Sequence, residues 1–235
     1  MTILGRFLKG SQNYCLNGPD SDEDWVVVYC RNFEELYNGK TYSHLSNEHE
    51  SYWDLRDFVN RLCAMDPTTL ECVFSTKQEY MNEDFKTLMG AIRLDCSHGA
   101  WIPQDWASFI NKMVGFIRSD MKKAINFRNE YSGRKALSRA FYFLGIAHYV
   151  CDNHGCLDVD AYRDTNQLYN LARTLKFMPE MTSTFDEQIE KLEGSLAYLC
   201  SSYQGVKPRY TSVNTIKEYA LIIAMKENNK YEVEA

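Results

Sequence analysis

The order of hydrophobic and polar positions gives the first part of the chain a mixture of strand and helix patterns. Residues 3–9 and 25–30 predict two strands, and 25–30 are rich in β-branched and aromatic side chains. Residues 70–74 have the same character and predict a further buried strand. Apolar side chains recur every three to four positions over residues 52–62 and 80–94 and predict helices there.

After Gly99 the strand patterns fade and only helical spacing continues. The sequence therefore predicts an α+β protein in two domains, one of mixed strands and helices over residues 1–100 and a helical one over residues 101–235, with the boundary near residues 97–103. Helices of the second domain are expected over residues 105–129, 135–151, 160–177, 184–203 and 215–228.

The composition is that of an ordinary folded protein, with 45% apolar and 25% charged residues among 235. No apolar run reaches the roughly 18 residues that a membrane-spanning helix needs. The N-terminal residues do not form a secretory signal, and the eight cysteines include no Cys-x-x-Cys pair. These features predict a cytoplasmic protein with reduced thiols and no membrane partner.

The net charge of −6 is unevenly distributed. Residues 1–100 contain 9 basic and 16 acidic side chains, whereas residues 112–139 contain 8 basic and 2 acidic ones. An acidic region beside a basic segment suits a metal-dependent site that faces a polyanion, and solvated helix faces produce the same pattern. No motif for reading a DNA sequence is evident.

The residues most informative for chemistry lie between the two first predicted strands. Gly10 and Ser11 end the first strand, and Asp22 and Asp24 open the second. Because strand side chains alternate, these two carboxylates are expected on one face, where they can hold Mg²⁺ or Mn²⁺. A glycine lets the backbone approach an anion closely, and the serine adds a hydroxyl and an N–H that can bind a triphosphate.

Glu71 is the candidate for a third carboxylate. It stands inside the apolar run of residues 70–74, where a charge is costly unless it is paired or bound to a metal. If this strand lies beside the one that begins with Asp22 and Asp24, three carboxylates meet and can hold two cations for phosphoryl or nucleotidyl transfer. A buried arginine partner and an exposed strand edge are the alternatives.

Gly10-Ser11, a spacer of ten residues and Asp22-x-Asp24 resemble the signature of the DNA polymerase beta-like nucleotidyltransferase superfamily. The fuller pattern is similar to a bacterial and phage branch of predicted nucleotidyltransferases, including an RNA-repair-associated member, through Tyr14, Pro19 and Ser21. In that branch a Leu-Glu strand supplies the third acid, a lysine recurs on a later helix, and an α/β palm precedes a helical domain.

The resemblance implies a magnesium- or manganese-dependent enzyme that transfers a nucleoside monophosphate from a nucleoside triphosphate such as ATP to an acceptor hydroxyl and releases pyrophosphate. An RNA end is the favoured acceptor, with a protein or a small molecule as alternatives. The implied catalytic and metal-binding residues are Asp22, Asp24 and Glu71. The implied substrate-binding residues are Gly10, Ser11, Tyr14, Ser21, Lys135 and Arg139.

Three positions depart from the family pattern. Cys15 stands where a glycine is usual, Glu23 separates the two aspartates where an apolar residue is usual, and Tyr142 stands where an arginine is expected. Arg139, one helical turn after Lys135, is the nearest substitute for that arginine. These departures keep a second interpretation open, a catalytically inactive nucleotidyltransferase-fold regulator or interaction protein, and Lys135 and Arg139 also suit an ordinary basic helix face.

Overall fold

A computed structural model describes the chain as two compact units. The first unit comprises Met1–Leu94 together with Tyr210–Ala235, and the second comprises Asp95–Arg209. The division differs from the expected one at residue 100 chiefly because the C-terminal segment joins the first unit. The fold is α+β, with eleven α-helices and one four-stranded mixed sheet in the described residues, which are 1–18, 21–98, 106–177, 184–202 and 212–232.

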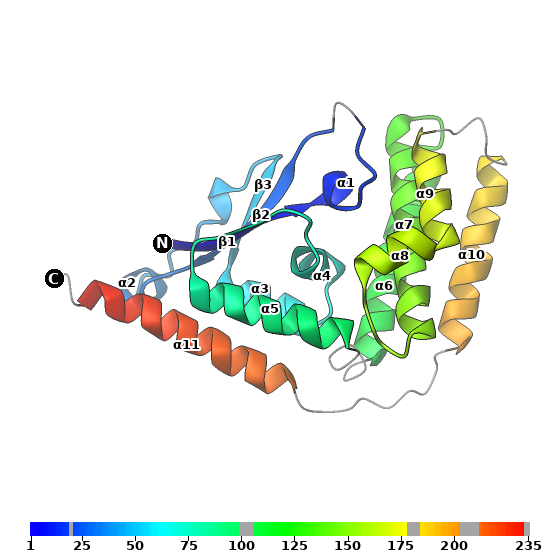
Figure 1. Cartoon of the computed structure of the whole chain (residues 1–235). Coiled ribbons are helices and arrows are strands. Elements are labelled where there is room, and N and C mark those ends of the chain that lie inside the picture. Colours follow the sequence, from blue (N-terminus) through cyan, green and yellow to red (C-terminus); the bar gives the residue numbers. More distant parts are fainter. Residues whose placement is uncertain (19–20, 99–105, 178–183, 203–211, 233–235) are drawn as a thin grey trace. The chain divides into compact units, whose positions relative to one another are not determined.

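The sheet belongs to the first unit and has the strand order β3-β2-β1-β4 (Figure 1). β1 pairs antiparallel with both β2 and β4, and β2 pairs parallel with β3. Lys9, the last residue of β1, lies opposite Asp24, the first residue of β2. The segment between β1 and β2 therefore lies at one end of these strands. The strands are β1 (Thr2–Lys9), β2 (Asp24–Cys30), β3 (Glu50–Asp54) and β4 (Gln78–Tyr80).

Helices of the first unit pack against this sheet and against one another. α3 contacts β2 and β3, α4 contacts β1, and the C-terminal helix α11 packs against α3 (Figure 1). Phe7, Phe58 and Phe85 form the aromatic centre of the core, and their ring centroids are 6.0 Å apart. The helical elements that begin in this unit are α1 (Gly10–Asn13), α2 (Phe33–Tyr37), the 3₁₀ turn η1 (Ser43–Leu45), α3 (Leu55–Cys63), α4 (Pro67–Val73), α5 (Glu83–Ser97) and α11 (Ser212–Glu232).

The strand expected around Glu71 is wrong, because these residues form helix α4. The Asp66 carboxylate caps the helix by accepting hydrogen bonds from the backbone N–H of Thr68 at 3.0 Å and of Thr69 at 3.4 Å. Pro67 occupies the first turn, where its fixed φ favours helix and its missing N–H costs nothing. The Asp-Pro pair thus begins a helix, and it outweighs the strand preference of the apolar residues that follow.

All elements in the described residues of the second unit are helices, as the apolar spacing predicts. α7 is its central helix, buried along most of its length and in contact with α6, α8, α9 and α10. The helix expected over residues 160–177 is instead two helices, because the backbone is extended at Asn166, with ψ of 124°. The helices are α6 (Trp106–Asn126), α7 (Tyr131–Asp152), α8 (Val159–Thr165), α9 (Gln167–Phe177) and α10 (Phe185–Ser202).

In the part of the chain that the structure describes, no helix combines the length and the apolar character that are needed to cross a membrane.

Candidate functional site

The backbone of Gly10 lies directly against the carboxylate of Asp24. Gly10 has φ of +72°, a conformation in which side chains are strained, and a Cβ atom added there would lie 2.9 Å from Oδ2 of Asp24. No other residue type fits this position without moving the carboxylate. The glycine of the predicted phosphate-binding turn and the second aspartate are therefore neighbours.

Asp22 and Asp24 both offer carboxylates that no described residue engages. β2 begins at Asp24, which is half-buried, and Asp22 lies just before it and is exposed. Neither carboxylate has a hydrogen-bond or ion-pair partner among the described residues. Glu23, in contrast, pairs at 3.3 Å with Lys77, whose ammonium lies 4.9 Å from the ring centre of Trp25. Glu23 therefore lies on the Trp25 face of the strand, opposite Asp24, in agreement with the expected alternation.

A lysine that the sequence reasoning missed lies on the same face as Asp24. Lys9 is the cross-strand neighbour of Asp24, and its Nζ donates a hydrogen bond to Oγ of Ser51 at 2.8 Å. Ser51 lies opposite Val26 in β3, two positions along from Asp24 and on the same face. The position of Lys9 directly before Gly10 is a usable signal. Ser51 has none, because the apolar spacing that begins at the next residue, over 52–62, predicts a helix and not the strand β3.

The predicted substrate-binding residues Ser11 and Ser21 occupy the turn itself. Ser11 is half-buried in α1. The Ser21 hydroxyl accepts a hydrogen bond from the N–H of Gly18 at 2.8 Å, and its carbonyl accepts one from the Gln12 amide at 2.8 Å. Ser21 thereby ties the loop before Asp22 to α1. Pro19 of the same motif lies outside the described residues.

Glu71 and Tyr14 face each other inside the first unit. Both side chains are buried, and the Tyr14 hydroxyl donates a hydrogen bond to the Glu71 carboxylate. Asn13 connects the same two helices, because its amide donates to the Glu71 carbonyl at 3.2 Å. The strand that was expected to bring Glu71 beside Asp22 and Asp24 is absent, and Glu71 instead joins α4 to α1.

The side chains at the strand ends can nevertheless supply magnesium ligands. No group of three or more His, Cys, Asp or Glu side chains that could hold a metal ion is found among the described residues. Magnesium in nucleotide sites is usually held by one or two carboxylates together with phosphate oxygens of the substrate. The oxygens of Asp22 and Asp24 fit that pattern, and the Asp24 carboxylate lies against the backbone of Gly10, which has no side chain to displace it.

Lys135 and Arg139 lie on α7 of the second unit. Arg139 forms a two-pronged ion pair with the buried carboxylate of Asp120, with Nε at 2.6 Å from Oδ2, and its guanidinium lies 5.2 Å from the Phe116 ring centre. Lys135 is exposed. Burial, together with the charge of Lys135, lowers the pKa of Lys176 to about 8. Arg139 thus has a structural role within its unit, whereas the Lys135 ammonium faces solvent.

Comparison with protein-family models, with curated proteins and with solved structures finds no match for this chain.

Proposed function

We propose that the protein is a metal-dependent nucleotidyltransferase that binds a nucleoside triphosphate where β1 ends and β2 begins. The observation that carries the proposal is the packing of Gly10 against the Asp24 carboxylate. A phosphate that approaches the Gly10 backbone meets the carboxylate that would hold its cation. The Gly-Ser and Asp-x-Asp motifs therefore have a physical reason to occur together in this chain.

Asp22 and Asp24 would hold Mg²⁺ or Mn²⁺ through their oxygens. The bound cation would supply neutralisation of the charge on the transferred phosphate and on the leaving pyrophosphate. Ser11 offers a hydroxyl to the triphosphate, and Lys9 offers a positive charge on the Asp24 face. An acceptor hydroxyl then attacks the α-phosphate in line and loses its proton to solvent, the bond from the α-phosphorus to the oxygen that bridges to the β-phosphate breaks, and pyrophosphate leaves. We assign Glu71 no step, because its carboxylate is engaged by Tyr14.

An RNA end is the acceptor that the charge distribution favours. Exposed lysines and an arginine on α6 have no hydrogen-bond or ion-pair partner among the described residues and can neutralise phosphates: Lys112, Arg118, Lys122 and Lys123. Binding through such contacts weakens as salt concentration rises. A protein or small-molecule acceptor would instead be labelled with little dependence on these side chains.

A non-catalytic regulator with the same fold is the second candidate. The observation that favours it is the engagement of Glu71 by Tyr14, which leaves two carboxylates at the proposed metal site instead of three. Such a protein would bind a nucleoside triphosphate together with a divalent cation and would transfer nothing.

The experiment is a transfer assay with the full chain, each of the four α-³²P-labelled ribonucleoside triphosphates, Mg²⁺ or Mn²⁺, and an RNA oligonucleotide with a free 3′ hydroxyl. Asp22→Asn and Asp24→Asn should each abolish labelling. Glu23→Gln is the matched control, because Glu23 stands between them but pairs with Lys77 on the other face.

The outcomes separate the two candidates. Labelled acceptor that requires both aspartates and survives Glu23→Gln supports the transferase. Metal-dependent nucleotide binding without any labelled RNA, protein or small molecule supports the regulator. Transfer that persists in both aspartate variants contradicts the proposed site.

A further inference from the structure

A pocket of about 380 Å³ lies in the first unit at the other end of β2 from Asp24. It is formed where the end of β2 and the helices α2, α3 and α11 meet. Cys30, which lines the pocket, is six positions along the strand from Asp24, a distance of roughly 20 Å. The pocket is thus separate from the proposed nucleotide site, and its volume lies in the range of small-molecule sites, roughly 300–1,000 Å³.

The pocket has an apolar part, which consists of aliphatic side chains from three helices and the thiol of Cys30. Burial raises the pKa of this thiol to about 11, so Cys30 is uncharged at neutral pH. The aliphatic residues are Leu36, Leu55, Val59, Ala220, Leu221 and Ala224.

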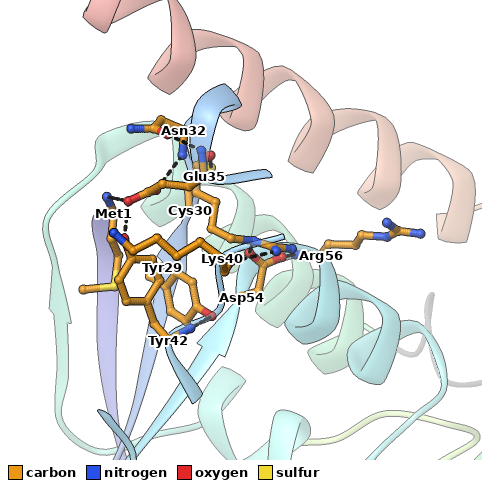
Figure 2. A network of polar contacts seen from close by, with 10 residues as sticks. Met1, Tyr29, Cys30, Asn32, Glu35, Lys40, Tyr42, Asp54 and Arg56 are labelled. Carbon is orange, nitrogen blue, oxygen red and sulfur yellow. Dashed lines mark hydrogen bonds and ion pairs between the residues drawn. The ribbon is translucent and has the colours of Figure 1, made fainter. Parts of the chain in front are cut away.

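The polar side chains of the pocket offer donors and positive charge. Arg56 and Asn60 come from α3 and Lys217 from α11, and none of these side chains has a hydrogen-bond or ion-pair partner among the described residues. Figure 2 shows Arg56 extending away from the polar network around Glu35 and Tyr42. An anionic group that entered the pocket would find two cations supplied by two different helices, Arg56 by α3 and Lys217 by α11.

The carboxylate that lines the pocket is already used. Oδ2 of Asp54 accepts a hydrogen bond from Nε of Arg31 at 2.8 Å, and Oδ1 accepts one from the backbone N–H of Arg56 at 3.0 Å. Asp54 also neutralises Arg31, so Arg56 and Lys217 give the lining side chains a net positive charge. A sugar or a nucleobase carries several donors, and the Asn60 amide oxygen is the one uncommitted oxygen acceptor that the described lining side chains offer them.

We infer that this pocket binds a hydrocarbon-bodied anion, of which a medium-chain carboxylate is the simplest example. The hydrocarbon body occupies the aliphatic walls, and the carboxylate accepts hydrogen bonds from Arg56 and Lys217. Each buried methylene should strengthen binding about fourfold until the pocket is full. Each lost cation should weaken binding about tenfold, as a charge-assisted hydrogen bond would.

The test is isothermal titration of the full chain with hexanoate, octanoate and decanoate below their micellar concentrations. Decanol and decylammonium serve as the uncharged and the cationic ligand of equal length. Decanoate should bind most tightly, and decanol and decylammonium at least about tenfold more weakly. Equal binding of all three ten-carbon ligands would overturn the inference, as would no binding of any carboxylate.

Variants identify the site. Arg56→Glu and Lys217→Glu should each weaken decanoate binding about tenfold or more, and Ala224→Phe, which fills the pocket, should do the same for all chain lengths. Lys86→Glu is the matched control, since Lys86 is exposed on α5 and pairs with Glu83.

Asp24→Asn should leave decanoate binding unchanged, because the pocket is separate from the proposed nucleotide site. Decanoate binding therefore tests the pocket whether or not the proposed nucleotide site is correct. Unchanged binding in both Arg56→Glu and Lys217→Glu, with folding verified by circular dichroism, would place the ligand elsewhere.

Discussion

The carboxylates of the first unit fall into two groups that differ in what surrounds them. Glu71 accepts a hydrogen bond from Tyr14 inside the unit, and Glu35 is bound by Tyr42, by the Met1 ammonium and by the N–H of Asn32 (Figure 2). Asp22 and Asp24, where β2 begins, have no such partner among the described residues. The first group is satisfied by the protein, and the second is open to a ligand.

This difference separates structural acids from candidate functional ones. A buried carboxylate that accepts hydrogen bonds stabilises the fold, and removal of its partner leaves an unsatisfied group. A carboxylate that no described residue engages contributes little to the fold and gains most from a bound cation. Substitutions in the two groups should therefore change different properties of the protein.

The largest expected effect is on nucleotide transfer, after substitution of Asp22 or Asp24, which we call the open pair. Asp24→Asn should lower the rate of transfer at least about 100-fold, because the charge that holds the cation is lost. The thermal midpoint of unfolding should stay about the same, because the Asp24 carboxylate has no hydrogen-bond or ion-pair partner among the described residues. A transfer assay and a melting curve on the same preparation measure both. A large loss of stability would put Asp24 with the structural acids.

Gly10→Ala tests the contact that brings the turn and the open pair together. The added Cβ lies 2.9 Å from Oδ2 of Asp24, and φ at this position is +72°. The strain should cost about 1–3 kcal/mol in the free energy of unfolding. The affinity for the metal–nucleotide complex should also fall, because the carboxylate must move. Chemical denaturation and nucleotide titration measure the two effects, and an unchanged affinity would contradict the proposed role of Gly10.

Tyr14→Phe tests Glu71, one of the two carboxylates that the protein itself hydrogen-bonds. It removes the hydroxyl that binds Glu71 and leaves a buried carboxylate short of a partner, which should lower the free energy of unfolding by about 1–3 kcal/mol. Glu71→Gln keeps a hydrogen-bond acceptor for the Tyr14 hydroxyl and should lower the free energy of unfolding by less than Tyr14→Phe does. If Glu71→Gln instead abolishes transfer while the protein remains as stable as the wild type, Glu71 belongs to the catalytic site as the sequence predicted.

Glu35 should have a smaller effect on the free energy of unfolding, and this effect depends on pH. Burial alone would raise the pKa of Glu35, but the hydrogen bonds from the Met1 ammonium, Tyr42 and Asn32 outweigh it and lower the pKa from 4.5 to about 2. Because the folded-state pKa is the lower one, this stabilisation is fully present above about pH 4.5 and declines as the pH falls toward 2.

Glu35→Gln should therefore lower the free energy of unfolding by about 1 kcal/mol at pH 7, and the difference from the wild type should shrink between pH 4.5 and pH 2. Urea unfolding over a series of pH values measures this. A difference that does not change with pH would show that the Glu35 charge contributes nothing.

The sequence predicts the regular elements where one signal dominates. Residues 25–30 are β-branched and aromatic without helical spacing, and they lie in β2. The apolar spacing of residues 135–151 gives a helix, and they lie in α7. The spacing of residues 52–62 was misleading, because Tyr52 and Trp53 continue the helical pattern but belong to β3, which is fixed by its pairing with β2. Strand pairing is a long-range interaction that spacing along the chain does not report.

The candidate site was predictable in its local part and not in its long-range part. The neighbours Gly10 and Asp24 follow from a motif within fifteen residues, and β1 and β2 bring them together. The predicted role of Glu71 as a third metal-binding carboxylate required a strand beside β2. The Asp66 cap instead starts the helix α4 at this point. Ser51 reaches Lys9 only through the pairing of β3, so no local pattern could identify it.

The measurement that tests the central claim most directly is a crystal structure of the full chain with Mn²⁺ and a nucleoside triphosphate analogue that cannot be cleaved at the α-phosphate. Anomalous scattering locates the manganese. The account predicts manganese bound by oxygens of Asp22 and Asp24, with the triphosphate against the Gly10 backbone. Manganese and nucleotide bound elsewhere, with these two carboxylates free of both, would contradict it.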